Sequence, residues 1–241
     1  MGLVLEPPFV LTLLAIPTEH LPSVAPGKEQ MEQQHRLDLL IDFLQDSDIG
    51  FAWQTPDGIA VLQSMPNPRL RTVSAVKAKS AANELIKVVS RYWSDMKINV
   101  GVAHSTEEIN EVAALFEQAR AALQYGPVLT KEKSVYHWQD LGCFQFIVGD
   151  LRSARVRQFI QDHLGPLLNK KPGGNSPEGL ATLEALVSGD SLQVIADRLF
   201  VHKQTIVFRK KKLADTLGVD LDELETRMNL AIAMKLFSLL S

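Results

Sequence analysis

The chain has 241 residues, of which 46% are hydrophobic and 22% charged, and its formal net charge is −3 at pH 7. This length accommodates one large or two ordinary domains, and the composition is that of an ordinary soluble protein. Because the charge balance is slightly acidic, any affinity for nucleic acid must come from a local basic patch.

The single cysteine argues against a disulfide-stabilised protein, and the N-terminal segment argues against a membrane-spanning or secreted one. Cys143 has no partner for an internal disulfide, which suits a reducing compartment, and its apolar neighbours predict a small buried side chain rather than a nucleophile. The apolar run Phe9–Ile16 is far shorter than the roughly 20 residues that cross a bilayer, and it lacks the flanks of a signal peptide. We therefore expect a cytoplasmic protein without a membrane partner.

Hydrophobic periodicity predicts alternating strands and helices over the first part of the chain. The expected strands are Phe9–Ile16, Ile49–Gln54, Ile59–Met65, Lys97–Ala103 and an edge strand at Ser134–Trp138. The expected helices are Gln30–Gln45, Val76–Trp93 and a third that runs from a capping box at Ser105–Glu108 to about Tyr125. Leu21–Gly27 is expected to be a loop, and Thr55–Gly58 a hairpin turn. This order predicts an α+β domain with a mainly antiparallel sheet backed by helices.

A change of composition follows this domain. Leu151 to about Leu168 has the pattern of a connecting helix, and Asn169–Gly179 is rich in proline and glycine, as linkers are. The sequence therefore predicts an α+β domain over residues 1–150, a connecting helix and linker over 151–179, and an all-α domain over 180–241.

The all-α part centres on Ser191–Leu213, which predicts two short helices joined by a tight turn. Ser191 is placed to cap a first helix with an apolar stripe, and Phe200–His202 would form the turn. The second helix would begin near Lys203 and turn Ile206 and Leu213 inward. Between Asp197 and Asp215 there are six basic residues and no acidic one. A basic surface without carboxylates is what a helix-turn-helix offers to a DNA duplex, although a solvated basic helix would show the same pattern.

Several blocks in this part carry a resemblance to a known family. They are LGPLL (Leu164–Leu168), GLATLEALV (Gly179–Val187), ADRLFVHKQTI (Ala196–Ile206) and the closing stretch Leu217–Leu240. Together they resemble the C-terminal helix-turn-helix domain of the PucR/CdaR group of bacterial transcriptional regulators. The resemblance implies binding to double-stranded DNA, and because a single such motif rarely gives useful affinity, a homodimer on a two-fold site is expected. The residues it implies as DNA contacts are His202, Lys203, Gln204, Thr205, Arg209, Lys211 and Lys212.

Within this set, Gln204 and Thr205 are placed to read bases, whereas the cations suit phosphates. The sequence departs from the family pattern at Val207, where an exposed arginine is common, and at Lys210, where an apolar residue would continue the inner stripe. Lys210 would loosen the packing unless its methylene groups lie along the core and its amino group reaches solvent.

The first domain resembles the GGDEF-like central domain of the same regulators, mainly over Ile98–Leu123 and Tyr136–Leu141. Cyclic-dinucleotide synthesis would need a metal-binding acid after the first strand and a Gly-Gly-acid-Glu-Phe turn, and neither is present. The chain also lacks the common nucleotide and zinc motifs. We therefore expect a degenerate domain, no enzymatic activity and no cofactor.

The sequence thus predicts a DNA-binding transcriptional regulator of the PucR/CdaR type. The alternatives are a protein that keeps this fold for dimerisation without binding DNA, and a small-molecule sensor or enzyme that uses a pocket in the first domain to bind an unknown effector. Members of the family usually carry a further N-terminal sensing domain, so the chain is expected to be a natural short form or a fragment.

Overall fold

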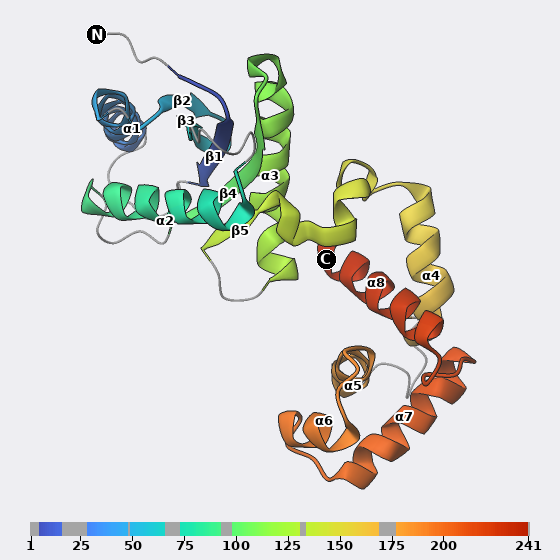
Figure 1. The fold of residues 1–241 in the computed structure, drawn as a ribbon. Coiled ribbons are helices and arrows are strands. Elements are labelled where there is room, and N and C mark those ends of the chain that lie inside the picture. Colours follow the sequence, from blue (N-terminus) through green and yellow to red (C-terminus); the bar gives the residue numbers. More distant parts are fainter. Residues whose placement is uncertain are drawn as a thin grey trace. The chain divides into compact units, whose positions relative to one another are not determined.

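A computed structural model describes residues 5–15, 28–47, 49–65, 73–92, 98–130, 134–168 and 177–240. The chain divides into two compact units, Met1–Val148 and Gly149–Ser241 (Figure 1). The first unit is a sheet with helices and the second is helical, which confirms the predicted fold class. The predicted loop Leu21–Gly27 and most of the predicted linker lie outside the described residues.

The first unit is built on a five-stranded sheet in the order β2-β3-β1-β4-β5. The strands are β1 (Phe9–Ala15), β2 (Phe51–Thr55), β3 (Gly58–Ser64), β4 (Asn99–Thr106) and β5 (Val135–His137). Central β1 pairs antiparallel with β3 and β4, while β5 runs parallel to β4 at the edge. The sheet is therefore mainly antiparallel, as the order of elements predicted.

Helices cover both faces of this sheet, which explains why β1 is apolar at nearly every position. Alternate β1 residues such as Val10 and Leu14 pack with α1 (Lys28–Asp46) and α2 (Ala75–Tyr92). Leu11 and Leu13 face the other way, toward α3 (Val112–Leu129). Helix α3 lies so close to β4 that a Cβ on Gly101 would stand 2.0 Å from the carbonyl oxygen of Ala119.

The predicted capping box at Ser105–Glu108 is wrong. Both Ser105 and Thr106 belong to β4, because pairing with β1 continues to the Phe9–Thr106 partners. A single 3-10 turn, η1 (Ile109–Glu111), follows, and its N-cap residue Glu108 makes no side-chain capping bond. The sheet register thus overrides the local helix-start signal, and α3 begins only at Val112.

The predicted burial of Cys143 is also wrong, because its side chain is exposed. It lies in the 3-10 segment η2 (Trp138–Phe146), which turns only Leu141 and Phe144 into the interior. The backbone kinks at Gly142, whose φ is 56°, and the buried positions on either side of Gly142 and Cys143 are taken by Leu141 and Phe144.

The second unit contains α4 (Ala154–Leu168), α5 (Pro177–Val187), α6 (Leu192–Arg198), α7 (Lys203–Leu217) and α8 (Leu224–Leu240). The last residues of the predicted linker form the first turn of α5. Helix α4 packs on α8 and α7, with Val156, Ile160 and Leu164 buried. In the described part of the chain, no helix is both long and apolar enough to cross a membrane.

Candidate nucleic-acid interface

Helix α6 begins and ends as the sequence predicts. The Ser191 hydroxyl accepts a hydrogen bond from the Val194 amide at 3.3 Å and so caps the helix. At its end the Val201 amide donates to the Ala196 carbonyl at 3.0 Å and the Phe200 amide to the Asp197 carbonyl at 3.3 Å. These paired bonds form a Schellman motif, which places Phe200 in the left-handed region with φ of 54°. The chain thereby turns sharply toward α7.

Helix α7 is fixed at both ends and along its inner face. The His202 ring nitrogen Nδ1 accepts from the Gln204 amide at 3.3 Å, and Gly218 closes the helix in the left-handed region with φ of 68°. Ile206 and Leu213 are buried, so the predicted inner stripe is confirmed. The small side chain of Ala196 is buried as well and lets α6 and α7 cross closely.

The outer face of α7 is formed by two rows of side chains spaced four residues apart. We call this surface the outer face; it consists of Lys203, Val207 and Lys211 in one row and Gln204, Phe208 and Lys212 in the other. All six side chains are exposed, including 49% of Val207 and 68% of Phe208. Within the described residues, the three amino groups and the Gln204 side-chain amide make no hydrogen bond or ion pair.

Three of the predicted contact residues lie outside this face. Arg209 turns toward α5, where its Nη2 pairs with Glu178 Oε2 at 2.6 Å and its Nη1 donates to Thr182 Oγ1 at 3.3 Å. Its side chain is only 23% exposed. Thr205 is half-buried at the border of the outer face, and exposed His202 stands at the start of the helix.

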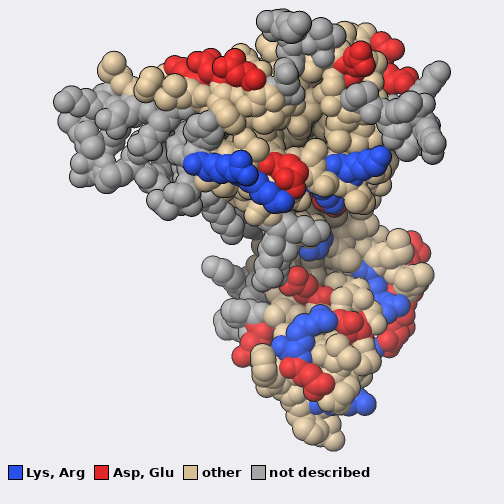
Figure 2. All heavy atoms as spheres, turned by 60° about the vertical axis from the view of Figure 1, so that its left-hand side comes forward, with Lys and Arg blue, Asp and Glu red and all other residues tan. Residues whose placement is uncertain are grey.

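Ion pairs within the unit neutralise further cations of the predicted basic surface. Lys210 is half-buried and donates to Asp222, and this hydrogen bond lowers the pKa of the Asp222 carboxyl below its ordinary value. Arg198 pairs with Asp190 in the same way. Figure 2 accordingly shows basic and acidic side chains close together on the helical unit. The cations of the outer face are therefore Lys203, Lys211 and Lys212.

The sequence alone did not single out Phe208. The sequence contains the spacing that places it there. Phe208 follows Gln204 by four residues and precedes Lys212 by four, so a helix must place all three in one row. The Lys210 side chain is only 25% exposed, and its amino group pairs with the exposed Asp222, as expected for a lysine whose stem is largely covered while its charge reaches the surface.

Other polar features of the first unit have structural explanations. Thr55 Oγ1 accepts from the Asp57 amide at 3.3 Å and donates to the Gly58 carbonyl at 3.0 Å, so this hairpin turn bonds within itself. His104 packs edge-on against His137, with 5.4 Å between ring centroids. No group of three or more His, Cys, Asp or Glu side chains within the described ranges is arranged to hold a metal ion.

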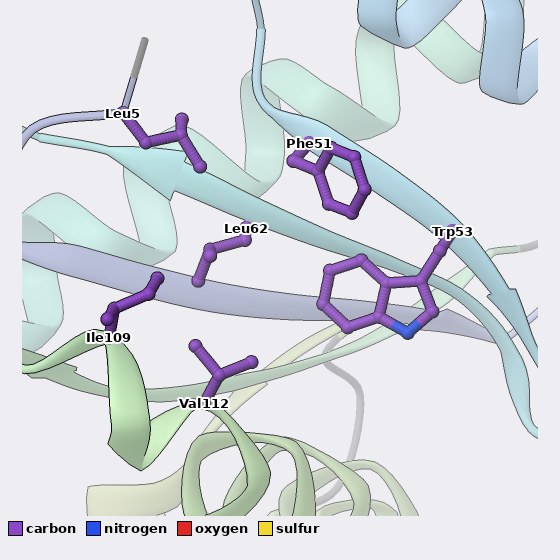
Figure 3. A pocket seen from close by; sticks show the side chains of 6 residues that line it. All are labelled: Leu5, Phe51, Trp53, Leu62, Ile109 and Val112. Atoms are coloured by element: carbon purple, nitrogen blue, oxygen red, sulfur yellow. The ribbon is translucent and has the colours of Figure 1, made fainter. Parts of the chain in front are cut away.

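The first unit has an apolar pocket of about 500 Å³ on the α3 side of the sheet (Figure 3). Phe51 and Trp53 of β2 form one wall, with ring centroids 5.8 Å apart. The remaining walls are Leu5, Leu62, Ile109 and Val112. The pocket is open to solvent and apolar, without a titratable side chain among these residues.

One family model matches part of the helical unit, whereas the similar proteins align with a longer part of the chain. Residues 180–236 match the family model of the PucR C-terminal helix-turn-helix domain. The chain is 22% identical over 163 residues to the proline-responsive transcriptional activator PutR of Bacillus subtilis (strain 168), which covers 65% of this chain and 39% of PutR. It is 28% identical over 147 residues to the purine catabolism regulatory protein of the same organism, covering 60% of this chain and 27% of the relative.

Among solved structures, the chain matches a regulator of polyketide synthase expression from Bifidobacterium adolescentis with a TM-score of 0.36 and 15% identity, over 95% of this chain and 80% of the other. The chain spans well under half the length of either Bacillus relative. Taken with the geometry of α6 and α7, the family match shows that the chain carries a PucR-type C-terminal helix-turn-helix domain, and the chain is homologous to PutR and to the purine catabolism regulatory protein.

Proposed function

We propose that this protein is a cytoplasmic transcriptional regulator that binds operator DNA as a homodimer through the helix-turn-helix of residues 191–213. The observation that supports it most strongly is the outer face of α7, where three lysines and one glutamine lack internal partners in the described structure. Unpaired cations attract phosphates, and a free amide can read a base edge.

The geometry divides the predicted contact residues into two roles. Lys203, Lys211 and Lys212 would meet phosphates, and Gln204 would read bases. Arg209 is instead proposed as a positioning residue, because its guanidinium already holds α7 to α5 through Glu178 and Thr182. His202 and Thr205 lie at the edge of the face and would add contacts at the start of the helix.

A homodimer is proposed because one such helix offers few contacts. Two copies related by a two-fold axis would place a second recognition helix in the next major groove and multiply the affinity. Analytical ultracentrifugation should therefore show a dimer at micromolar concentration, and a strictly monomeric protein would contradict this part of the proposal.

Sequence-specific binding is tested by fluorescence anisotropy with a duplex from upstream of the protein's own gene and a scrambled duplex of equal composition. We expect the native protein to prefer the upstream duplex and Gln204→Ala to lose most of that preference while it still binds both. Equal affinity of the native protein for the two duplexes would contradict a regulatory role at this site.

A small-molecule sensor is a second candidate function, favoured by the apolar pocket beside Phe51 and Trp53. Its size and aromatic wall suit a planar apolar effector. Such a ligand would quench Trp53 fluorescence and raise the melting temperature, because binding to the folded state stabilises it. A Trp53→Ala variant is the control, and unchanged melting across a library of aromatic compounds would count against this candidate.

A further inference from the structure

The outer face of α7 carries apolar side chains between its polar ones. Val207 is 49% exposed and Phe208 68% exposed, although Ile206 and Leu213 already supply the inner face of the helix. Exposed apolar side chains that cluster on one surface indicate a contact site. A partner of this surface must therefore have apolar groups that contact Val207 and Phe208.

The charges that flank these apolar side chains indicate what kind of partner covers them. In the first row, Val207 lies four residues after Lys203 and four before Lys211. In the second row, Phe208 lies between Gln204 and Lys212 at the same spacing. A partner that covers both apolar side chains must also accept the flanking amino groups, which favours a polyanion. In the major groove of DNA, the apolar feature of the base pairs is the C5-methyl group of thymine.

The side chain of Gln204 further limits which base pair this face would recognise. Its amide is suited to bidentate hydrogen bonding with adenine N6 and N7. Side chains three and four residues apart on a helix have neighbouring Cβ atoms, about 5–6 Å apart, so Gln204 adjoins both Val207 and Phe208. Stacked bases rise by about 3.4 Å per step. The amide and the apolar side chains would therefore face the same base pair or adjacent ones.

Building on the proposed DNA-binding function, we propose that Val207 and Phe208 determine specificity by packing on thymine methyl groups, while Gln204 reads adenine in the same short A·T-containing step. The half-site contacted by α7 thus contains A·T pairs, and each methyl contact contributes apolar burial that no other base offers in the major groove. Val207 is then a determinant of operator choice.

The test removes the methyl groups alone. Duplexes that the full chain selects from a random pool are resynthesised with deoxyuridine in place of each thymidine in turn. We expect the selected half-sites to contain A·T pairs at their centre. Removal of a contacted methyl should weaken binding about fourfold, as expected for one buried methyl-sized group. Val207→Ala and Phe208→Ala should each reduce this penalty at a different position of the half-site.

Val76→Ala is the matched control, because Val76 is 78% exposed on α2 of the other unit. The Val76→Ala variant should lose as much affinity as the native protein when a contacted thymidine is replaced by deoxyuridine. Selective binding that ignores the deoxyuridine substitutions, or half-sites without A·T pairs, would overturn the inference and leave the proposed function standing. Binding to no duplex, with Val207→Ala or Phe208→Ala instead abolishing self-association, would overturn both and make the face a protein contact.

Discussion

Phe200 occupies a backbone conformation that costs a bulky residue free energy. It has φ of 54° and is 95% exposed, so its ring gains little from burial. A left-handed conformation costs an L-residue roughly 1–2 kcal/mol, which glycine avoids. Phe200→Gly should therefore raise the free energy of unfolding by about 1 kcal/mol, measured by urea titration.

The control for this substitution is Phe146→Gly. Phe146 is 90% exposed but does not have a positive φ. Glycine there should leave the stability unchanged or reduce it by up to about 1 kcal/mol, because the unfolded chain gains entropy. A decrease of stability in Phe200→Gly would show that the ring makes a contact worth more than its backbone strain.

His137 makes the stability of the first unit dependent on pH. Its side chain is buried; this burial, together with the nearby His104 and Lys79, lowers its pKa from 6.5 to about 4. Between these values the unfolded chain binds a proton at this site and the folded chain does not. The contribution of neutral His137 to the free energy of unfolding should thus be complete above pH 6.5. It should decrease as the pH falls toward 4, by about 1.4 kcal/mol per pH unit at most.

The native protein is compared with the His137→Asn variant. The free energy of unfolding of both proteins is measured by urea titration from pH 4.5 to 7.5. The His137 ring accepts from the Gln139 amide at 3.0 Å, and asparagine keeps an oxygen acceptor there. The variant should be less stable at pH 7 and show a shallower slope below pH 6.5. The same slope in both proteins would assign the acid sensitivity to other groups.

At the scale of elements, Arg209 is expected to position α7, whereas Lys211 is expected to contact phosphate. Arg209→Ala removes the ties from α7 to α5, so it should lower the stability of the helical unit by about 1–2 kcal/mol, because both an ion pair and stem packing disappear. It should weaken DNA binding and leave the salt slope unchanged. Chemical unfolding and anisotropy across a salt series measure both effects, and a reduced slope would make Arg209 a direct contact.

Sequence patterns predicted elements best where local rules determined the structure. The capped start of α6 and the inner stripe of α7 follow from short-range spacing, and both are confirmed. The inward turn of Arg209 depends on Glu178, 31 residues away, so no local pattern revealed it. The capping box at Ser105 failed for the same reason, because pairing with distant β1 decides where β4 ends.

At the scale of the whole molecule, α4 belongs with the helices that follow it. Val156, Ile160, Leu164 and Leu167 of this helix are buried in the second unit. We therefore expect residues 149–241 to fold alone and residues 180–241 to melt without cooperativity. Deletion of four buried apolar side chains removes several kcal/mol, comparable with the stability of a small domain. Circular dichroism melting of both fragments tests this, and equal cooperative transitions would make α4 a mere connector.

The predicted linker shows the limit of composition as a guide to boundaries. Proline and glycine predict a break near Asn169–Gly179, yet Pro177 begins α5, where a missing amide costs nothing in the first helical turn. Which side of the break a helix packs on depends on the distant residues that its apolar face contacts, and the helical pattern of Leu151–Leu168 does not identify those residues.

The measurement that tests the central claim most directly is the salt dependence of DNA binding by the native chain and by Lys211→Ala. Lys77→Ala is the control, since Lys77 is an exposed lysine on α2 whose amino group has no partner in the described structure. We predict a steep decrease in affinity with salt for the native chain and an unchanged slope in Lys77→Ala. In Lys211→Ala the slope should be lower by about 0.9 for each phosphate that the protein no longer neutralises. Native protein without DNA affinity, or one slope shared by all three proteins, would contradict recognition of DNA through the outer face of α7.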